Sequence, residues 1–348
     1  MKKYTILFCT LFLANVLTAQ VVNIPDSTFK AILVGNYSIN TNKDKEIQVS
    51  EAIAYKGSIE VIRQSVKDLT GIEAFVNITK LDCNKNNLTT LDVSKNIDLK
   101  ILNCSFNQLT TLDVNKNIDL EFLNCNNNRL ITIDLSKNIG LAVLKCDFNQ
   151  LTNLNINKNT ELKELSFYNN SITDIDVSKN IDLTVLYCSN NQLTILDVSN
   201  NIRLKFLGCK LNKLTTLNTN KNIVLTQLNC ENNQLTNLDV SKSISLTQLF
   251  CNRNQLITLD ISKNIELKIL ECFFNKLTTL DVSKNTSLTY LDCYSNNLNE
   301  LNLKNGNNHN LTHFDATLNP LLKRIVADNP AKFSTIWGKA GTATYSAE

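Results

Sequence analysis

Cysteines are the residues of this 348-residue chain whose type and spacing could do chemistry. Ten of the eleven recur at intervals of 21 residues, with one double step across Phe167. Many cysteines in an extracellular protein would ordinarily indicate disulfide bonds, and thiolates also ligate zinc. The arrangement of the ten in space has to decide between bonded, metal-bound and free thiols. They are Cys83, Cys104, Cys125, Cys146, Cys188, Cys209, Cys230, Cys251, Cys272 and Cys293.

Each cysteine belongs to a repeated unit, L-x-x-L-x-C-x-x-N-x-L-x-x-L-D-V-S-K-N-I-x. Eleven copies start between Ile78 and Leu288, and a twelfth covers 311–321 after a two-residue insertion. One unit cannot cover its own leucines, so copies must stack. The alternation of Leu102 and Cys104 with polar neighbours predicts one short strand per unit, paired in parallel at about 4.8 Å. The fold class is therefore an α/β repeat solenoid of about 12 coils.

This geometry favours free thiols that pack in the core. Cysteines on neighbouring in-register strands point the same way, which disfavours a relaxed disulfide. Zinc needs ligands that converge tetrahedrally, and no histidine lies near the row. Val61, Phe167 and Ala316 fill the equivalent slot, and none of them carries a thiol. We therefore expect a structural ladder of unpaired cysteines, represented by Cys104, Cys125, Cys188 and Cys209.

An asparagine three residues after each cysteine position recurs without exception. A buried asparagine can satisfy backbone groups where the chain turns out of the strand. We expect this structural role for Asn107, Asn128 and Asn191. A second asparagine column, at Asn96 and Asn117 and onward, indicates a similar role at the other turn, where Ile118 is expected to close the coil.

Residues 40–51, NTNKDKEIQVSE, resemble a degenerate EF-hand loop between two short helices. Asn replaces the usual Asp at position 1, and Lys45 replaces the usual Gly at position 6. Both changes weaken a cation site, so we expect a capping turn without an ion, with calcium as the alternative cofactor and no other cofactor. The residues at the ligand positions are Asn40, Asn42, Asp44, Glu46 and Glu51.

No motif of an enzyme is present. The only histidines, His309 and His313, lie in the last coil, and there is no nucleophile elbow, phosphate loop or zinc motif. The aspartates of the L-D-V-S segments are followed by lysines three residues later, which indicates a solvated convex surface rather than a cation track. A formal net charge of +3 gives no reason to expect a nucleic-acid partner.

Function should therefore lie on the outward positions of the concave strands. Aromatic residues gather there in two groups, and exposed aromatics are typical of binding surfaces. The alternative is that β-propensity alone tolerates them on a sheet. The candidate ligand-binding residues are Tyr168, Tyr187 and Phe206 in the first group, and Phe250, Phe273, Tyr290 and Tyr294 in the second.

Four segments follow from these patterns. Residues 1–19 are predicted to be a secretory signal, with two lysines before a short apolar run. Residues 20–58 are a helical cap that contains the EF-hand-like loop, 59–325 the solenoid, and 326–348 a C-terminal cap with Pro330, Phe333, Trp337 and Tyr345. We expect no membrane span, a secreted or cell-surface location and a monomer.

The repeat resembles the leucine-rich repeat family over about residues 59–325, and more narrowly its bacterial, internalin-like subgroup with a cysteine ladder. The resemblance implies a curved solenoid with a parallel sheet on the concave face, which binds a protein or glycan on another cell or surface. The alternative function is a structural spacer of the cell envelope without a specific ligand.

Overall fold

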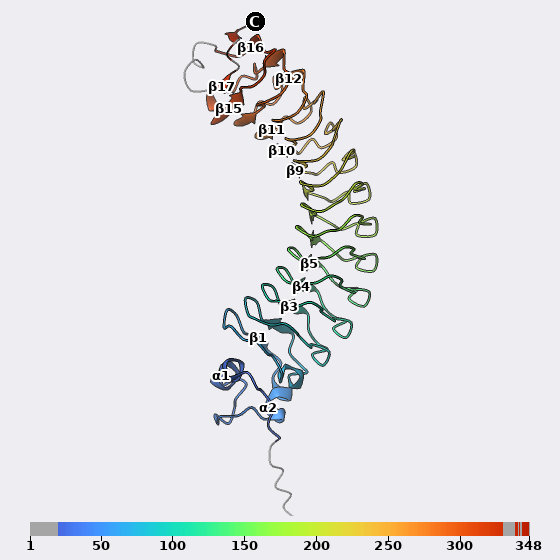
Figure 1. Ribbon diagram of the computed structural model, residues 1–348, viewed down its shortest axis with the longest axis vertical. Coiled ribbons are helices and arrows are strands. Elements are labelled where there is room, and N and C mark those ends of the chain that lie inside the picture. The colour runs from blue at the N-terminus through green and yellow to red at the C-terminus, as the bar shows by residue number, and fades with distance from the viewer. Residues whose placement is uncertain (1–19, 330–337, 340, 342, 348) are drawn as a thin grey trace, which may run out of the picture.

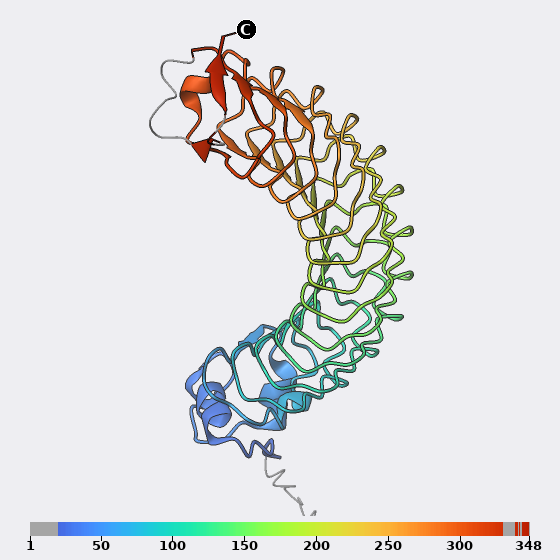
Figure 2. The same ribbon diagram turned by 45° about the horizontal axis from the view of Figure 1, so that its top comes forward.

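Each 21-residue unit makes one turn of a solenoid in the computed structural model, which describes residues 20–329, 338, 339, 341 and 343–347. The turns stack into an arc, with the short strands along its inner side and the loops along its outer side (Figures 1 and 2). The predicted signal at 1–19 lies outside the described residues. Within those residues, no helix has the length and apolarity needed to cross a membrane.

The concave face is a parallel sheet of 14 strands. Neighbouring strands pair in register, so that Leu102 lies opposite Leu123 and Leu186 opposite Leu207. The strands are β1 Ser58–Glu60, β2 Lys80–Asp82, β3 Ile101–Asn103, β4 Phe122–Asn124, β5 Val143–Lys145, β6 Glu164–Ser166, β7 Val185–Tyr187, β8 Phe206–Gly208, β9 Gln227–Asn229, β10 Gln248–Phe250, β11 Ile269–Glu271, β13 Tyr290–Asp292, β15 His313–Ala316 and β17 Gly338–Lys339.

The predicted fold class, with its parallel concave sheet and small helical cap, is confirmed. The sheet has more strands than the twelve predicted repeats because β1 belongs to the irregular first coil and β17 extends the sheet beyond the last repeat. On the opposite wall, regular pairing occurs only towards the C-terminus. A parallel sheet of four strands forms there: β12 Thr279–Asp281, β14 Glu300–Asn302, β16 Arg324–Val326 and β18 Thr344–Ser346.

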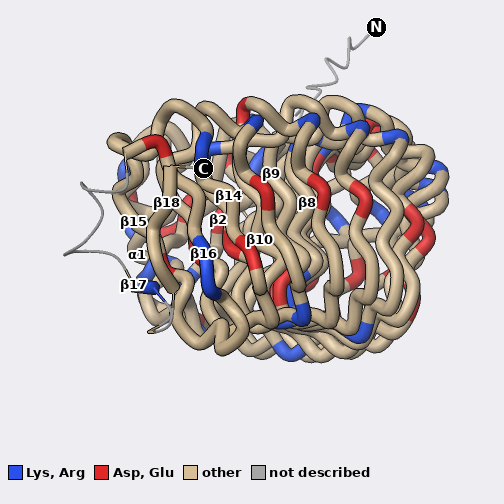
Figure 3. The backbone as a smooth tube through the Cα atoms, turned by 90° about the horizontal axis from the view of Figure 1, so that it is seen from above, with Lys and Arg blue, Asp and Glu red and all other residues tan. Residues whose placement is uncertain are grey.

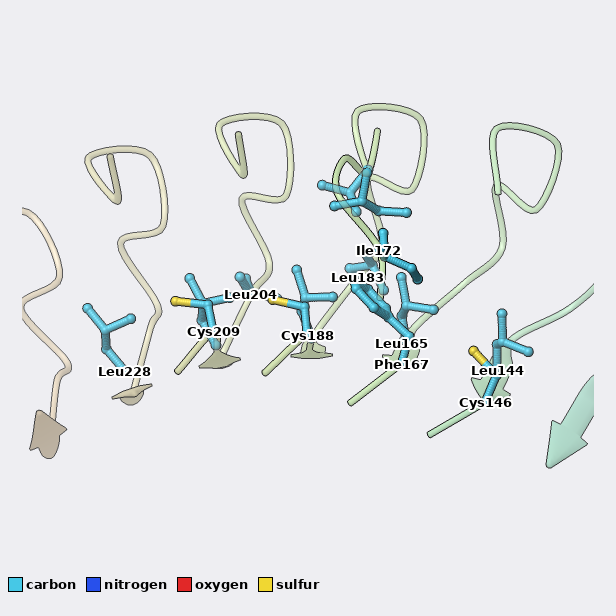
Figure 4. Packing of buried hydrophobic residues seen from close by; sticks show 14 of the residues in the cluster. Leu144, Cys146, Leu165, Phe167, Ile172, Leu183, Cys188, Leu204, Cys209 and Leu228 are labelled. Carbon is cyan, nitrogen blue, oxygen red and sulfur yellow. The ribbon is translucent and has the colours of Figure 1, made fainter. Parts of the chain in front are cut away.

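The core runs along the whole arc as stacked columns of leucine and cysteine. Leu186 and Cys188 are fully buried, and so are Leu207 and Cys209 in the next coil. Figure 4 shows these cysteines in one row, with Phe167 in the slot between Cys146 and Cys188. Repetition thus gives every coil the same partners above and below, which is how a short unit buries its apolar residues.

The expectation that Ile118 closes the coil is wrong, because this side chain is 57% exposed. Asn117 takes the inward place at the turn instead, where its Nδ2 donates to the carbonyls of Val93 and Asn96 at 3.0 and 2.8 Å. The next residue then points outward. The same turn exposes a row of isoleucines: Ile97, Ile118, Ile139, Ile181, Ile202, Ile223, Ile244 and Ile265.

Two helices cap the N-terminal end, α1 (Ser27–Gly35) and α2 (Val49–Ala54), and two 3₁₀ helices occur at Ile72–Ala74 and Asn308–Asn310. Asp26 is the N-cap of α1, and its carboxylate accepts hydrogen bonds from Thr28 and Phe29, both at 3.0 Å. Its other oxygen accepts from the Lys67 backbone at 2.9 Å. The same carboxylate therefore caps the helix and fastens it to the first coil.

Beyond residue 325 the chain continues both sheets. Strand β17 pairs with β15, and β18 pairs with β16. Of the aromatic residues predicted to cover the last coil, Tyr345 lies in β18, half-buried. Pro330, Phe333 and Trp337 lie outside the described residues. The predicted segment boundaries stay predictions.

Candidate functional site on the concave face

Outward side chains of the concave face are set by the alternation along each three-residue strand. In β7, Leu186 is buried while Val185 and Tyr187 face outward. The residue after each cysteine adds a third outward position. Because the strands pair in register, residues at one position form columns that run along the arc. The buried leucines supply the packing of the core, so the outward residues are not needed for it and can serve to bind a ligand.

The cysteine ladder lies directly behind this face and is chemically inert. All ten described cysteines are free and buried. Burial raises the pKa of every one of these thiols, that of Cys230 to about 12. A thiol with so high a pKa is hardly ionised at neutral pH and is a poor nucleophile or metal ligand. The predicted cysteine ladder is present, and that its thiols stay unpaired in solution is a prediction.

We expect thiol reagents to distinguish folded from unfolded protein sharply. The native protein should react slowly because the thiols are buried and protonated. After unfolding without reductant, all ten described cysteines of a chain that lacks residues 1–19 should react with the reagent. Mass spectrometry after alkylation measures the count, and a number near zero would mean that the cysteines pair.

The first asparagine column holds the strands and the following turns together. The Nδ2 of Asn107 donates to the carbonyls of Cys83 and Cys104, both at 3.0 Å. Its Oδ1 accepts from the Leu88 backbone at 3.0 Å. Asn128 and Asn191 repeat this pattern in their own coils. Each side chain therefore bonds the backbone of its own coil and of the coil before it.

The first aromatic group consists of two separate pairs. Tyr187 and Phe206 lie on neighbouring strands with ring centroids 4.4 Å apart. Gly208 lies opposite Tyr187, and a Cβ there would approach Phe206 to 3.1 Å and Tyr187 to 3.4 Å. The glycine thus leaves room for this pair. Tyr168, in contrast, packs edge-on against Phe148 at 5.0 Å.

The second aromatic group is connected through residues that were not predicted. Phe274 contacts both Phe273, at 5.9 Å, and Tyr294, at 5.1 Å, between ring centroids. Tyr290 stacks on His313 with centroids 4.3 Å apart. Phe250 has no ring partner among the described residues. The structure therefore brings two of the four predicted aromatics together, Phe273 and Tyr294, through Phe274, and places Tyr290 in a separate stack with His313.

Phe148 and Phe274 were missed because strand alternation would turn them inward. Both lie two residues after a cysteine position or its equivalent, where the backbone is left-handed, with φ of 51° and 50°. A positive φ redirects the side chain outward. Every repeat has such a residue, and four of them are asparagines, a residue type that tolerates this conformation. The enrichment in asparagine at this position is the sequence signal that indicates a left-handed backbone and therefore an outward side chain.

The EF-hand-like loop is held by hydrogen bonds within the protein. The Glu51 carboxylate accepts four of them, from the backbone and hydroxyl of Thr41 and the backbones of Asn42 and Gln48, at 2.8–3.1 Å. Burial by itself would raise the pKa of Glu51, but these hydrogen bonds together hold it below its ordinary value. Asn40 points inward and donates to the carbonyls of Val34 and Asp44.

We expect calcium to have little effect on the stability of this cap. Glu51→Ala should cost about 1–3 kcal/mol, because it leaves one buried donor, the Gln48 backbone, and three partly buried donors without their partner. The loss should be equal in chelator and in calcium, since protein donors already satisfy the carboxylate. Thermal melts of both proteins under both conditions measure this. A calcium-dependent rise of many degrees in the wild type alone would identify a working ion site.

Charges are spread along the coils, with acidic and basic residues interspersed (Figure 3). On the convex wall the aspartates accept hydrogen bonds within their own turn. For example, Asp197 Oδ1 accepts from the Ser199 backbone N–H at 2.9 Å. Hydrogen bonds from Ser199 lower the pKa of Asp197. Ion pairs such as Lys145–Glu164, at 2.8 Å, cross neighbouring strands of the concave sheet. Among the described residues, no group of His, Cys, Asp or Glu has the geometry to hold a metal ion.

Comparison with known sequences finds leucine-rich repeats. A family model described as leucine rich repeats (2 copies) matches residues 160–197. A segment of 72 residues, 21% of this chain, is 37% identical to internalin J of Listeria monocytogenes serotype 4b. This segment covers 8% of internalin J, so the sequence match spans a small part of that relative.

Comparison with solved structures extends the likeness to nearly the whole chain. The functional domain of InlJ from Listeria monocytogenes, which includes a cysteine ladder, matches with a TM-score of 0.77 at 34% identity, covering 93% of this chain and 71% of that one. An internalin (inlF) of the same species matches at 0.73 with 18% identity, over 95% and 94% of the two chains. A leucine-rich repeat protein of Leptospira interrogans matches at 0.67 with 22% identity, over 86% and 75%. The last two show the fold alone.

Proposed function

Because this chain belongs to the bacterial leucine-rich repeat proteins with a cysteine ladder, as internalin J does, we propose that it is a binding module that engages a protein or glycan through its concave face. We propose further that it acts outside the cell, secreted or at the surface, and that it is not an enzyme. The observation that carries the proposal is the placement of paired aromatic rings on the outward columns of the concave sheet, such as Tyr187 with Phe206.

These rings supply what a binding surface needs. Tyr187 is 37% exposed, although its ring already packs against Phe206 and over Gly208. Packing fixes the ring orientation before a ligand arrives, which lowers the entropy lost on binding. Aromatic residues are also the commonest anchors of protein interfaces. A spacer without a ligand, the alternative function, would have no use for such preorganised rings.

The test compares two double variants of the immobilised protein. Tyr187→Ala/Phe273→Ala removes one ring from each aromatic group. Ile195→Ala/Ile257→Ala removes exposed side chains of similar apolar character from the outer wall, where they are 68% and 54% exposed. Retention of proteins from cell-surface extracts and of glycans on an array should fall at least about tenfold in the first variant only. Equal retention by wild type and both variants would contradict binding by the concave face.

A further inference from the structure

Acidic residues on the concave face differ in their ion pairs along the arc. Towards the N-terminus, Glu60 and Glu164 pair with Lys80 and Lys145 at 2.7 and 2.8 Å. Towards the C-terminus, Glu271 of β11 lies in register with Asp292 of β13, and Asp292 with Asp315 of β15. Within the described residues the one ion pair of this row joins Asp292 to His313, with the Asp292 carboxylate 3.9 Å from Nε2, and it exists only when the imidazole is protonated.

Two carboxyl groups of this row, those of Glu271 and Asp292, have a raised pKa. Burial raises the pKa of Glu271, and the charges of Asp292 and Glu231 raise it further. Burial also raises the pKa of Asp292, with a further contribution from Asp315. The hydroxyl of Tyr290 has a raised pKa from burial and from the same carboxylates. A negative potential therefore covers this part of the face, and a bound cation would relieve it.

Asn252 provides an independent observation beside this row. Its side chain is only 1% exposed, yet neither Oδ1 nor Nδ2 has a hydrogen-bond partner in the described structure. Two residues later, Asn254 donates to the carbonyls of Cys230 and Cys251 at 3.0 and 3.1 Å. Burying an unpaired amide is unfavourable, because the group loses its hydrogen bonds to water without gaining others. The side chain of Asn252 therefore contributes no hydrogen bond to the folded state alone.

Asn252 faces the concave side, because Cys251 before it points into the core. Its neighbours in the column of residues after the cysteines are Glu231 and Phe273, whose coils hydrogen-bond to its own. Phe250 precedes it by two residues and lies in register with Glu271. Phe250 and Phe273 are the aromatic residues of the same face that the register of the strands and coils places beside it. We call this set the Asn252 patch: Glu231, Phe250, Asn252, Glu271, Phe273 and Asp292.

We propose that the Asn252 patch binds a lysine or arginine side chain of a protein partner, with the amide of Asn252 hydrogen-bonding the partner's backbone once the Phe273 ring turns aside. The inference rests on the concave-face function proposed above and names the chemistry of the partner. Carboxylates bind the cation, and an amide that both donates and accepts matches a peptide group.

The rings of the patch are suited to a cation as well. Arg253 already lies over the ring of Phe274, with the guanidinium carbon 4.6 Å from the centroid, and 5.9 Å from that of Phe273. This intramolecular contact shows that the local rings accept a guanidinium face. A neutral glycan would use the rings and the amide but would leave the row of carboxylates uncompensated. The observations therefore favour a basic peptide.

The test uses fluorescein-labelled decapeptides in which lysine alternates with serine, and matched peptides with norleucine or glutamate in place of lysine. At about 50 mM salt, where screening is modest, the lysine peptide should bind and the other two should not. Glu271→Gln/Asp292→Asn should weaken the lysine peptide at least about tenfold. Glu60→Gln/Glu164→Gln changes the net charge equally on the other half of the face and should change the affinity less than about twofold.

A second variant separates binding from folding. Asn252→Leu keeps the side-chain size but removes the amide, so the midpoint of urea unfolding should stay equal or rise. Affinity for the lysine peptide should nevertheless fall about fivefold or more, the loss of roughly one hydrogen bond. A lower midpoint with unchanged affinity would make Asn252 a purely structural residue and overturn its assigned role.

Three other outcomes would overturn the proposal. If the two charge variants weaken binding of the lysine peptide equally, the binding depends on net charge and not on this patch. Retention of the norleucine peptide or of a chito-oligosaccharide, unaffected by Glu271→Gln/Asp292→Asn, would indicate a neutral ligand. Calcium that competes fully with the lysine peptide would indicate a cation site for metal. If the Tyr187→Ala/Phe273→Ala variant loses its partners while no lysine peptide binds, the concave-face function stands and this inference fails.

Discussion

Replacing Phe167 with alanine is expected to lower the free energy of unfolding by about 3–5 kcal/mol, the cost of emptying a buried aromatic site. The ring is fully buried in the column that cysteines occupy elsewhere, between Cys146 and Cys188 (Figure 4). Backbone hydrogen bonds fix the coils on both sides, as where Cys146 donates to Ser166 and Phe167 to Tyr187, both at 2.9 Å. The surroundings therefore cannot collapse into the cavity.

Cys188→Ala, in the next coil, is the matched control. It removes only a sulfur atom from the same column and should cost about 1 kcal/mol. Because a solenoid can open locally, hydrogen exchange of the amides in the two coils should accompany urea unfolding followed by circular dichroism. Equal losses from the two variants would show that the Phe167 slot is not tightly packed.

Phe167→Cys restores the commonest residue of the column and should still cost about 2–4 kcal/mol. The coil of Phe167 has Ile172 and Ile175 where the next coil has Leu193 and Leu196, and all four are buried. A β-branched side chain has a different shape from leucine, so this coil has a packing arrangement of its own. The repeat consensus is therefore not the most stable choice at this position.

The period of 21 residues was sufficient to predict the architecture. An identical unit has to meet its own copy above and below, so inward residues such as Leu186 and Cys188 must stack in register. The asparagine columns follow from the same constraint, because each turn repeats the same unpaired backbone groups. Fold, ladder and columns could be predicted because each depends only on what the repeats share.

Features that depend on one position inside the unit could not be predicted in the same way. Phe274 faces outward because its φ is positive, which the alternation rule does not consider. Ile118 faces outward because Asn117 occupies the turn. Tyr168 packs against Phe148 rather than Tyr187, because contacts between rings depend on side-chain rotamers. Each case is decided by local backbone geometry or by individual side chains, which a periodic pattern does not specify.

The unpaired side chain of Asn252 is another feature that a periodic pattern does not specify. The sequence distinguishes Asn252 from Asn254 by position, because Asn254 belongs to the first asparagine column and Asn252 is a variable outward residue, but it does not show that Asn252 lacks partners. The structure shows the difference in hydrogen bonding, which satisfies Asn254 and leaves Asn252 unpaired. The invariant positions thus supply the stability of the solenoid, while the variable outward positions can carry unpaired polar groups whose cost the rest of the coil offsets.

Asn191→Ala is expected to lower the free energy of unfolding by about 3–5 kcal/mol, because several buried backbone groups lose their partner at about 1–3 kcal/mol each. The side chain donates to the carbonyls of Phe167, Cys188 and Ser189 at 3.0, 3.1 and 3.1 Å. It also accepts from the Ile172 backbone at 3.0 Å. It therefore bonds two coils, and its loss should increase hydrogen exchange in both.

Asp197→Ala, six residues later, is the control. Asp197 is exposed on the convex wall and its carboxylate accepts from Ser199 within its own turn, so its loss should cost at most about 0.5 kcal/mol. Because the folded pKa of Asp197 is lowered, its contribution should be present above its unfolded pKa, about 3.9, and disappear as the pH falls through the folded value. Paired urea melts at pH 7 and about pH 2.5 measure both effects. The loss from Asn191→Ala should persist at the lower pH, since an amide does not titrate. A larger loss from Asp197→Ala at pH 7 would mean that the inward and outward assignment of the repeat is wrong, and the assignment of Tyr187 and Phe273 to the binding face would fall with it.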